Sequence, residues 1–282
     1  MKGSLLCGLI GAGIQRSLAP ALHEEEGRHH GLRVHYQLID LDSTGAGVEA
    51  LPALMAAVRI IGFTGLNITY PCKQAVIPLL DELTAEAREM GAVNTVVRKD
   101  GRLVGHNTDG FGWSWGLRRA LPKAKLDRVV LLGAGGAGSA IGHAALRLGT
   151  GRLVIVDKDP TRAVALARKL NGVHGAERAR AERDIAAALE AADGLIQATP
   201  VGMGNLPGLP LPEELLRPQL WISEIVYVPL ETELLKAARR IGCPTADGGH
   251  MNVGQAYRAF ELFTGLEADA ARMDAHFRRL VS

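Results

Sequence analysis

A glycine-rich turn carries the clearest chemical signal in this sequence. Gly133, Gly135 and Gly138 have the spacing GxGxxG and lie between an apolar run, Val129 to Leu132, and a helix-like segment. In such a turn the first glycine permits a tight bend, the second lets the backbone approach a pyrophosphate, and the third lets the helix pack against the strand. The pattern predicts a dinucleotide-binding turn with the anion at the helix N-terminus, and a turn used only for packing is the alternative.

An acidic residue completes this pattern. Asp157 follows the next apolar run about 20 residues beyond the turn, where a carboxylate accepts hydrogen bonds from the ribose hydroxyls of a bound dinucleotide. The same carboxylate repels a 2′-phosphate, by about 4 kcal/mol for unit charges ~4 Å apart at an effective dielectric constant of about 20. We therefore predict NAD rather than NADP as the cofactor, with Lys158 and Arg162 as the cations that could offset this repulsion.

Two polar clusters precede this turn in the sequence. One runs from Asn67 to Lys73, and the other joins Asn94-Thr95 to the segment 107–110. Both border apolar runs, so we expect them where strands of one sheet end. Taken alone, Lys73 would be an ordinary solvated cation and Asp109 the N-cap of a following helix.

The elements that would position these residues alternate between apolar runs and helix-like segments. In the first part of the chain, apolar runs occupy residues 5–10, 34–41 and 62–68, and helix-like segments occupy residues 19–30 and 47–58. This alternation predicts a parallel α/β sheet. The dipeptide Asp100-Gly101 between two apolar runs predicts a hairpin that closes the first domain.

The same alternation restarts after the hairpin. Predicted strands occupy residues 129–132, 152–156, 194–198 and 220–225, and a predicted helix occupies residues 139–148. Residues 253–280 are typical of one or two amphipathic helices, and the pair Gly248-Gly249 indicates where the chain returns to the first domain. We therefore predict two α/β domains, one formed by residues 1–110 and completed by residues 249–282, and a Rossmann-like domain formed by residues 111–248.

Composition excludes several other classes of protein. The 282 residues are 47% hydrophobic and 22% charged with a net charge of +2, which is typical of a globular protein and gives no basic surface for nucleic acid. Three widely separated cysteines favour a reducing, cytoplasmic compartment, and glycines interrupt the longest uncharged run, so we predict no membrane segment. The nine histidines have no metal-ligand spacing, so no metal site is predicted.

Six sequence motifs resemble those of the shikimate dehydrogenase family, in the family's order and across nearly the whole chain. They are Gly-Leu-Asn-Ile-Thr-Tyr-Pro-Cys-Lys (65–73), Gly-Ala-Val-Asn-Thr (91–95), His-Asn-Thr-Asp-Gly (106–110), Gly-Ala-Gly-Gly-Ala-Gly (133–138), Ala-Thr-Pro-Val-Gly-Met (198–203) and Tyr-Val-Pro-Leu-Glu-Thr (227–232). Asp157 and the segment 231–235 resemble the NAD-preferring quinate/shikimate dehydrogenases most. The resemblance implies an enzyme with two α/β domains and a cleft. It also implies NAD-linked interconversion of a ring hydroxyl and a ketone on a small cyclohexane or cyclohexene carboxylate such as shikimate or quinate.

The same resemblance implies roles for individual residues. Lys73 and Asp109 would form the catalytic pair, and Ser17 would bind the substrate carboxylate. The other substrate-binding residues would be Asn67, Thr69, Asn94, Tyr227 and Gln255. The cofactor would contact Gly133, Gly135, Gly136, Ala137, Gly138, Asp157, Lys158, Arg162, Thr199, Val201, Met203, Gly248 and Met251. For Met203, Tyr227 and Met251, packing in the core is an equally good interpretation.

The chemistry of alcohol oxidation agrees with the catalytic assignments. One group must take the hydroxyl proton while a hydride leaves for the nicotinamide, and a lysine can do this as a neutral amine. A carboxylate beside a lysine favours the charged ammonium form. Asp109 is therefore assigned to orienting the substrate and Lys73 rather than to activating the base.

One position departs from the family pattern. Where the family presents two hydroxyls to the substrate carboxylate, this chain has Ser17 and Ala19. Losing one hydrogen bond to a charged group, worth roughly 1.5–3 kcal/mol, would weaken binding about ten- to a hundredfold. Arg16 could replace the contact, or the substrate could be another ring acid such as an amino-substituted analogue. A non-catalytic, NAD-responsive binding protein is a further alternative, which the presence of Lys73 and Asp109 disfavours, and a homodimer is compatible with the sequence.

Overall fold

The computed structural model describes residues 3–282, which form two compact units. Unit 1 comprises residues 3–108 and 255–282, and unit 2 comprises residues 109–254. Each unit is an α/β structure with its own sheet. Within the described residues, no helix is long and apolar enough to cross a membrane.

The chain returns to unit 1 inside one continuous helix, α11 (Gly248–Thr264). The sequence analysis expected this return at the pair Gly248-Gly249, but both glycines already lie in the first turn of α11. Glycine is needed at position 248 for a different reason, because a Cβ there would collide with the backbone carbonyl of Val226. The close approach of the Val226 carbonyl explains this glycine.

Unit 1 is built around a mixed sheet with the strand order β2-β1-β3-β5-β6-β4. Its strands are β1 (Gly3–Gly11), β2 (Leu32–Asp40), β3 (Gly65–Ile68), β4 (Glu82–Leu83), β5 (Thr95–Lys99) and β6 (Arg102–His106). β1 is parallel to β2 and β3 as predicted, but β5 is antiparallel to both β3 and β6, so the sheet as a whole is not parallel. The predicted hairpin at Asp100 and Gly101, whose left-handed φ values are 51° and 78°, reverses the chain between β5 and β6.

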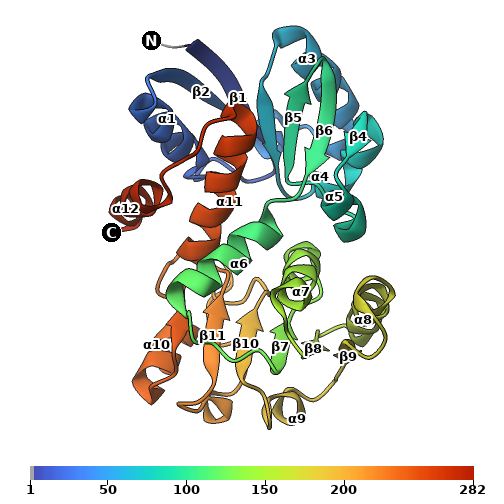
Figure 1. The fold of residues 1–282 in the computed structure, drawn as a ribbon, viewed down its shortest axis with the longest axis vertical. Coiled ribbons are helices and arrows are strands. Elements are labelled where there is room, and N and C mark those ends of the chain that lie inside the picture. The colour runs from blue at the N-terminus through green and yellow to red at the C-terminus, as the bar shows by residue number, and fades with distance from the viewer. Residues whose placement is uncertain (1–2) are drawn as a thin grey trace. The chain divides into compact units, whose positions relative to one another are not determined.

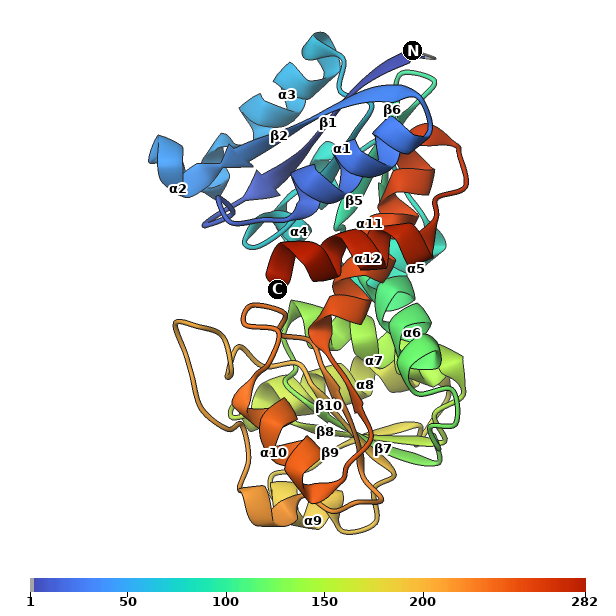
Figure 2. The ribbon, with the colours of Figure 1, turned by 90° about the vertical axis from the view of Figure 1, so that its left-hand side faces the viewer.

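Helices cover both faces of this sheet, with α1 (Ala19–His29) and α3 (Leu51–Ile61) on opposite sides of β1 and β2 (Figure 2). On one face, Met55 of α3 belongs to the same buried cluster as Leu66 of β3. On the other face, His23 of α1 stacks on Tyr36 of β2 with ring centroids 4.9 Å apart. The remaining helices are α2 (Leu41–Thr44), α4 (Cys72–Ala75), α5 (Ala85–Met90) and α12 (Ala270–Val281).

One predicted strand boundary in unit 1 is wrong. The sequence analysis began the third strand at residue 62, but α3 extends to Ile61 and ends at Gly62, whose φ is +89°. A left-handed glycine after a helix is the usual helix C-cap, so it stops the helix rather than starting the strand. β3 consequently begins at Gly65.

Unit 2 has a parallel sheet with the strand order β12-β11-β10-β7-β8-β9 (Figure 1). Its strands are β7 (Arg128–Leu132), β8 (Arg152–Val156), β9 (Ala179–Ala181), β10 (Gly194–Gln197), β11 (Trp221–Glu224) and β12 (Thr245–Ala246). Its helices are α6 (Asp109–Ala120), α7 (Gly136–Leu148), α8 (Pro160–His174), α9 (Ile185–Leu189) and α10 (Glu233–Ile241). This architecture confirms the predicted second α/β unit, although α7 begins three residues earlier than expected.

Both faces of the unit 2 sheet are buried, because alternate residues of β7 enter different cores. Val129 and Leu131 join the cluster formed with α6, α7 and α8, whereas Val130 and Leu132 join the cluster formed with α9 and α10. Figure 2 shows α7 and α8 on one side of this sheet and α9 and α10 on the other. The strand order reverses between β7 and β10, which is where open α/β sheets bind dinucleotides.

Candidate active site

Five strands of unit 1, β1, β2, β3, β4 and β6, end at one edge of its sheet, and β5 begins there. The register pairs Ile10 of β1 with Ile68 of β3, and it pairs Thr95 of β5 with both Asn67 and His106. Because β5 is antiparallel, its first residue lies beside the last residues of β3 and β6. The segments that flank these strand ends therefore meet here. We call this the polar edge, and it carries Asn67, Thr69, Lys73, Asn94 and Thr108.

A buried hydrogen-bond network fixes Asn67 at the polar edge. The hydroxyl of Tyr36 donates to Asn67 Oδ1 at 2.7 Å, and Asn67 Nδ2 donates to Thr95 Oγ1 at 3.0 Å. Nδ2 also donates to the backbone carbonyl of Asn94 at 3.3 Å. These side chains are buried, and the backbone carbonyl of Asn94 can only accept a hydrogen bond, so Nδ2 of Asn67 must face it. The hydroxyl of Tyr36 then supplies the donor that Asn67 Oδ1 needs.

Asn94 extends this network to the segment before α6. Its Oδ1 accepts a hydrogen bond from the backbone N–H of Thr108 at 2.7 Å, and its Nδ2 donates to Thr108 Oγ1 at 2.9 Å. Asp109 follows directly as the first residue of α6 and is buried. Asn94, a predicted substrate-binding residue, thus holds Thr108, which directly precedes the predicted catalytic residue Asp109.

Lys73 lies on the short helix α4, and backbone hydrogen bonds attach this helix to the polar edge. The carbonyl of Lys73 accepts a hydrogen bond from the N–H of Val93 at 2.8 Å, next to Asn94. The N–H of Cys72 bonds to the carbonyl of Thr69 at 2.8 Å. Lys73 itself is half-buried, so it is not the fully solvated cation of the alternative interpretation.

Ser17 lies in the loop between β1 and α1, and Asp40 at the end of β2 organises this loop. Asp40 Oδ1 accepts a hydrogen bond from the N–H of Gly13 at 3.0 Å, and Oδ2 accepts one from the N–H of Ile14 at 3.2 Å. Ser17 Oγ accepts a hydrogen bond from the N–H of Ala19 at 3.3 Å. The hydroxyl hydrogen of Ser17 remains able to donate to an anion.

The glycine turn of unit 2 has the geometry that its sequence predicts. Gly133 has a left-handed φ of +105°, and a Cβ there would lie 2.7 Å from the carbonyl oxygen of Ala198. A Cβ at Gly138 would collide with the carbonyl of Gly133, so the third glycine lets α7 approach the turn. At Gly136 a Cβ would meet no atom within 4 Å. The turn therefore fits a dinucleotide pyrophosphate, with open space beside the start of α7.

Two carboxylates, not one, lie at the end of β8. Asp157 Oδ2 accepts a hydrogen bond from the N–H of Ala134 at 2.6 Å, and Oδ1 accepts one from the N–H of Asp159 at 2.9 Å. Asp159 is the N-cap of α8, and its Oδ1 accepts hydrogen bonds from the N–H of Thr161 at 2.9 Å and from its hydroxyl at 2.6 Å. The sequence analysis singled out Asp157 but missed Asp159.

Two cations flank these carboxylates. Lys158 and Arg162 are both exposed. The pKa of Asp159 is lowered chiefly by hydrogen bonds from Thr161, and the charge of Arg162 contributes to the same shift. Arg162 is thus close enough to Asp159 for their charges to offset one another.

Buried Gln197 shapes the loop after β10. Its Nε2 donates to the carbonyl of Val201 at 2.7 Å, and its Oε1 accepts a hydrogen bond from the hydroxyl of Thr199 at 2.9 Å. Met203, further along this loop, is 41% exposed and does not pack in the core. Met251, by contrast, packs against the buried cluster of α6, α7 and α8.

The loop after β11 carries Tyr227 and begins at a buried carboxylate. Burial raises the pKa of Glu224 to about 7, although hydrogen bonds from Val226, Thr232 and Ile225 oppose this shift. Burial also raises the pKa of Tyr227, and a hydrogen bond with Asn252 of α11 opposes that shift.

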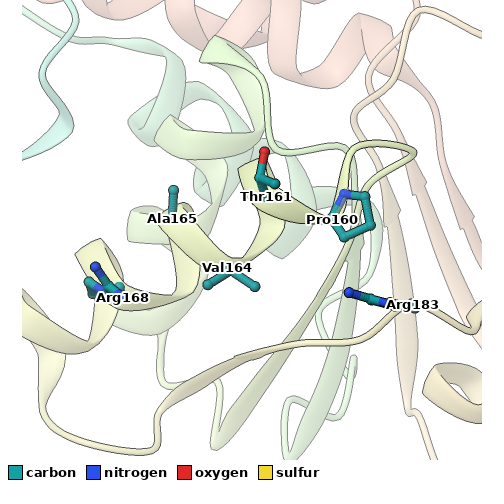
Figure 3. Close-up of a pocket in the computed structure, with 6 residues that line it drawn as sticks. All are labelled: Pro160, Thr161, Val164, Ala165, Arg168 and Arg183. Carbon is teal, nitrogen blue, oxygen red and sulfur yellow. The ribbon is translucent and has the colours of Figure 1, made fainter.

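A pocket of about 300 Å³ is lined by none of the predicted site residues. Figure 3 shows that its lining comes from α8 and from Arg183, which lies between β9 and α9. Pro160 and Thr161 of its lining are neighbours of Asp159, but Asp157, Lys158 and Arg162 are not part of it. We assign it no part in the chemistry. Within residues 3–282, no three histidine, cysteine, aspartate or glutamate side chains are grouped in a way that could hold a metal ion.

The structure therefore brings the predicted residues together in two groups, one in each unit. In unit 1 the group is the polar edge, and Gln255 lies on the part of α11 that returns to this unit. In unit 2 the loops after β7, β8, β10 and β11 carry most of the remaining predicted residues at one end of the parallel sheet. Asp109 begins α6, and Gly248 and Met251 lie on α11. The sequence motifs did not point to Tyr36, Gln197 or Glu224, whereas Thr95 belongs to a predicted polar cluster. Glu224 had a usable signal, because like Asp157 it is an acidic residue at the end of an apolar run.

Comparisons with known proteins point to one family. Residues 9–96 match the family model described as the shikimate dehydrogenase substrate binding domain. The chain is 56% identical over 281 residues to the shikimate dehydrogenase (NADP+) of Streptomyces avermitilis, with coverage of 99% of this chain and 97% of that protein. It is 46% identical over 286 residues to the quinate/shikimate dehydrogenase (NAD+) of Corynebacterium glutamicum, with coverage of 99% and 100%. The structure of the quinate dehydrogenase from Corynebacterium glutamicum in complex with NAD superposes with a TM-score of 0.94 at 45% identity, covering 99% of this chain and 100% of that chain.

Proposed function

Because this chain belongs to the shikimate dehydrogenase family, we propose that it interconverts a ring hydroxyl and a ketone on shikimate- or quinate-type carboxylates with a nicotinamide dinucleotide. The observation that carries this proposal is the polar edge, where the segments bearing Asn67, Lys73 and Asn94 are joined by hydrogen bonds. A protein that only binds the cofactor would not need this cluster. The reactions are shikimate to 3-dehydroshikimate and quinate to 3-dehydroquinate.

The proton moves through Lys73. As a neutral amine, Lys73 accepts the proton of the substrate hydroxyl, and in the reverse direction the ammonium returns it to the ketone oxygen. A bound nicotinamide would supply hydride transfer to and from the carbon that bears this hydroxyl. Asp109 orients the substrate hydroxyl and the lysine. Asn67, Thr69, Asn94, Tyr227 and Gln255 hold the ring, and Ser17 donates to its carboxylate.

NAD is the preferred cofactor in this proposal for two reasons. The end of β8 is acidic, and the side chain of Asp159 already accepts a hydrogen bond from an N–H at the start of α8. Asp157 and Asp159 both oppose the 2′-phosphate of NADP, and Asp159 uses the N-terminal N–H of α8 that could otherwise bind this phosphate. Arg162 is the group that opposes this preference, but part of its charge is offset by Asp159. Each carboxylate oxygen of Asp157 accepts one backbone hydrogen bond, which leaves lone pairs that ribose hydroxyls of NAD would use.

A second candidate substrate is favoured by Ala19. The methyl group of this residue replaces a hydroxyl donor of the family pattern, so a ring acid with a different set of substituents could bind better than shikimate or quinate. Ser17 still supplies one donor, which is why we keep the ring carboxylates as the first candidates.

A substrate panel tests the proposal. The purified protein is assayed with shikimate, quinate and an amino-substituted ring acid, each with NAD and with NADP, by following reduced nicotinamide. We expect turnover of at least one ring acid and a higher kcat/KM with NAD. Turnover only with the amino-substituted acid would establish the second candidate. NAD binding without turnover of any ring acid would instead support the non-catalytic alternative.

A further inference from the structure

The carboxylate of Glu224 holds both ends of the loop that carries Tyr227. At the start of this loop, Glu224 Oε1 accepts hydrogen bonds from the N–H of Ile225 at 2.9 Å and the N–H of Val226 at 3.0 Å. At its end, Glu224 Oε2 accepts a hydrogen bond from the hydroxyl of Thr232 at 3.0 Å. One buried side chain therefore closes the loop, which we call the 225–232 loop.

Glu224 forms no ion pair with any of the described residues, and burial excludes water from its carboxylate. Glu224 and Thr232 are each 1% exposed. A Cβ on Gly202, in the loop after β10, would come 3.9 Å from Glu224 Oε2. Asp247 and His250 line the same small recess as Glu224. If the carboxylate were removed, two backbone N–H groups and a hydroxyl would stay buried without their acceptor.

The 225–232 loop is also fixed against the helices that follow it. Thr232 Oγ1 accepts a hydrogen bond from the N–H of Leu235 at 3.3 Å as the N-cap of α10. The carbonyl of Val226 packs closely against Gly248 at the start of α11. Tyr227 is hydrogen-bonded to Asn252 of the same helix. A shift at the ends of the loop would therefore move Tyr227 away from α11.

We propose that Glu224 is a positioning residue that sets the placement of Tyr227 by holding both ends of the 225–232 loop. This inference rests on the proposed function, because it takes Tyr227 as a substrate-binding residue. Glu224 is buried and bonded to both ends of this loop, so its effect on the reaction passes through the loop. It differs from a purely structural residue because its loss changes the binding of the ring acid by correctly folded enzyme.

The test is a kinetic comparison of three substitutions at saturating cofactor. Glu224→Ala is expected to raise KM for the ring acid about tenfold or more, the equivalent of one lost hydrogen bond, while kcat changes by less than about threefold. Glu224→Gln keeps an amide oxygen for the two backbone N–H groups and is expected to stay within about threefold of the wild-type KM. Thr232→Val removes only the hydroxyl at the far end of the loop. Its KM for the ring acid is expected to lie between those of Glu224→Gln and Glu224→Ala.

Glu26→Ala is the matched control for loss of a buried carboxylate. Glu26 of α1 is also 1% exposed, and it is hydrogen-bonded to the backbone N–H of Asp269 and to Arg272. This variant is expected to lower the melting temperature without changing KM. An unchanged KM in folded Glu224→Ala enzyme overturns the inference, and so does an equal rise in KM in Glu26→Ala enzyme.

Proteolysis tests the loop without any substrate. Glu231 is exposed in the 225–232 loop, so cleavage after it by a glutamate-specific protease reports how often the loop opens. We expect cleavage at this bond about tenfold faster in Glu224→Ala than in wild-type or Glu26→Ala protein, and equal rates overturn the inference. If the wild-type enzyme turns over no ring acid, the proposed function fails, whereas faster cleavage would still show that Glu224 holds the loop.

Discussion

The carboxylate of Asp157 and the backbone N–H of Ala134 form a 2.6 Å hydrogen bond that ties the end of β8 to the glycine turn after β7. The predicted ribose-binding residue and the predicted pyrophosphate-binding turn are thus parts of one rigid arrangement. Asp159 is joined to it through its own N–H. The negative charge at this end of the sheet is therefore carried by two aspartate side chains, and backbone N–H groups hold both of them in place.

Replacing these carboxylates should weaken the preference for NAD. Asp157→Asn and Asp159→Asn each remove one charge that opposes the 2′-phosphate, while asparagine remains a good N-cap at position 159. We expect the ratio of NADP to NAD dissociation constants to fall in each variant and further in the double variant. Calorimetric titration with both cofactors measures this ratio.

Asp184 supplies the control for this prediction. It is the N-cap of α9 and accepts a hydrogen bond from the N–H of Ala186 at 2.9 Å, as Asp159 does at α8. Asp184→Asn should leave the cofactor preference unchanged. Tight NADP binding by the wild-type protein would mean that Lys158 and Arg162 outweigh the two aspartates.

The glycine turn and the hairpin could be predicted because their chemistry is local. The left-handed φ of Gly133 and the pair of left-handed residues Asp100 and Gly101 are properties of a few consecutive residues. The short strands β9 and β12 could not be predicted in the same way. Strands of three and two residues carry too little periodicity, and they form only because a neighbouring strand supplies their hydrogen bonds.

The polar edge was predictable only in part. Motif resemblance pointed to Asn67, Lys73 and Asn94, but nothing in the sequence connected Asn67 with Tyr36, which lies 31 residues away on a different strand. Their hydrogen bond depends on the order β2-β1-β3 and on the register of these strands. Tyr36 reads as an ordinary aromatic residue of a strand until the sheet is assembled.

Tyr36→Phe should weaken substrate binding more than it affects the cofactor. The substitution leaves Asn67 Oδ1 buried without its hydroxyl donor, at a cost of about 1–3 kcal/mol. We expect KM for the ring acid to rise about tenfold or less, while the dissociation constant for NAD, measured by calorimetry, stays unchanged. A Tyr36→Phe enzyme with wild-type KM would show that Thr95 and the backbone of Asn94 suffice to orient Asn67.

Acid should destabilise the protein partly through His23. Burial lowers the pKa of His23 to about 3, so its folded-state pKa lies below its value of 6.5 in the unfolded chain. Above about pH 6.5 His23 is neutral in both the folded and the unfolded protein, and the free energy of unfolding is at its full value. As pH falls from 6.5 toward 3, only the unfolded state binds the proton, so the free energy of unfolding decreases. Each pH unit of that shift corresponds to about 1.4 kcal/mol.

His23→Phe isolates this contribution. The imidazole lies among Tyr36, Phe260 and Phe263, so a phenyl ring has similar neighbours and does not titrate. We expect the melting temperature of the variant to fall less than that of the wild type between pH 7 and pH 5. Parallel melting profiles over this range would mean that His23 does not titrate with the assigned shift.

Ala19→Ser should restore the second carboxylate donor of the family pattern. A charge-assisted hydrogen bond of roughly 1.5–3 kcal/mol predicts a KM for shikimate or quinate that is lower by up to about ten- to a hundredfold. Steady-state kinetics with both acids measure this effect, and Ser17→Ala in the same assay should act in the opposite direction. No gain in the Ala19→Ser enzyme would indicate that Arg16 already supplies the contact or that the natural substrate does not need it.

Lys73→Ala should separate proton transfer from cofactor binding. A positioned acid or base usually contributes about 10²–10⁴-fold to the rate, so kcat should fall by that factor. NAD affinity should change little, because the glycine turn belongs to unit 2 and Lys73 to unit 1. Asp109→Asn keeps the shape of the side chain and should cost less, since its assigned role is orientation. A Lys73→Ala enzyme with near-normal kcat on its best substrate would exclude the lysine as the base, and a simultaneous loss of NAD binding would indicate damage to the fold instead.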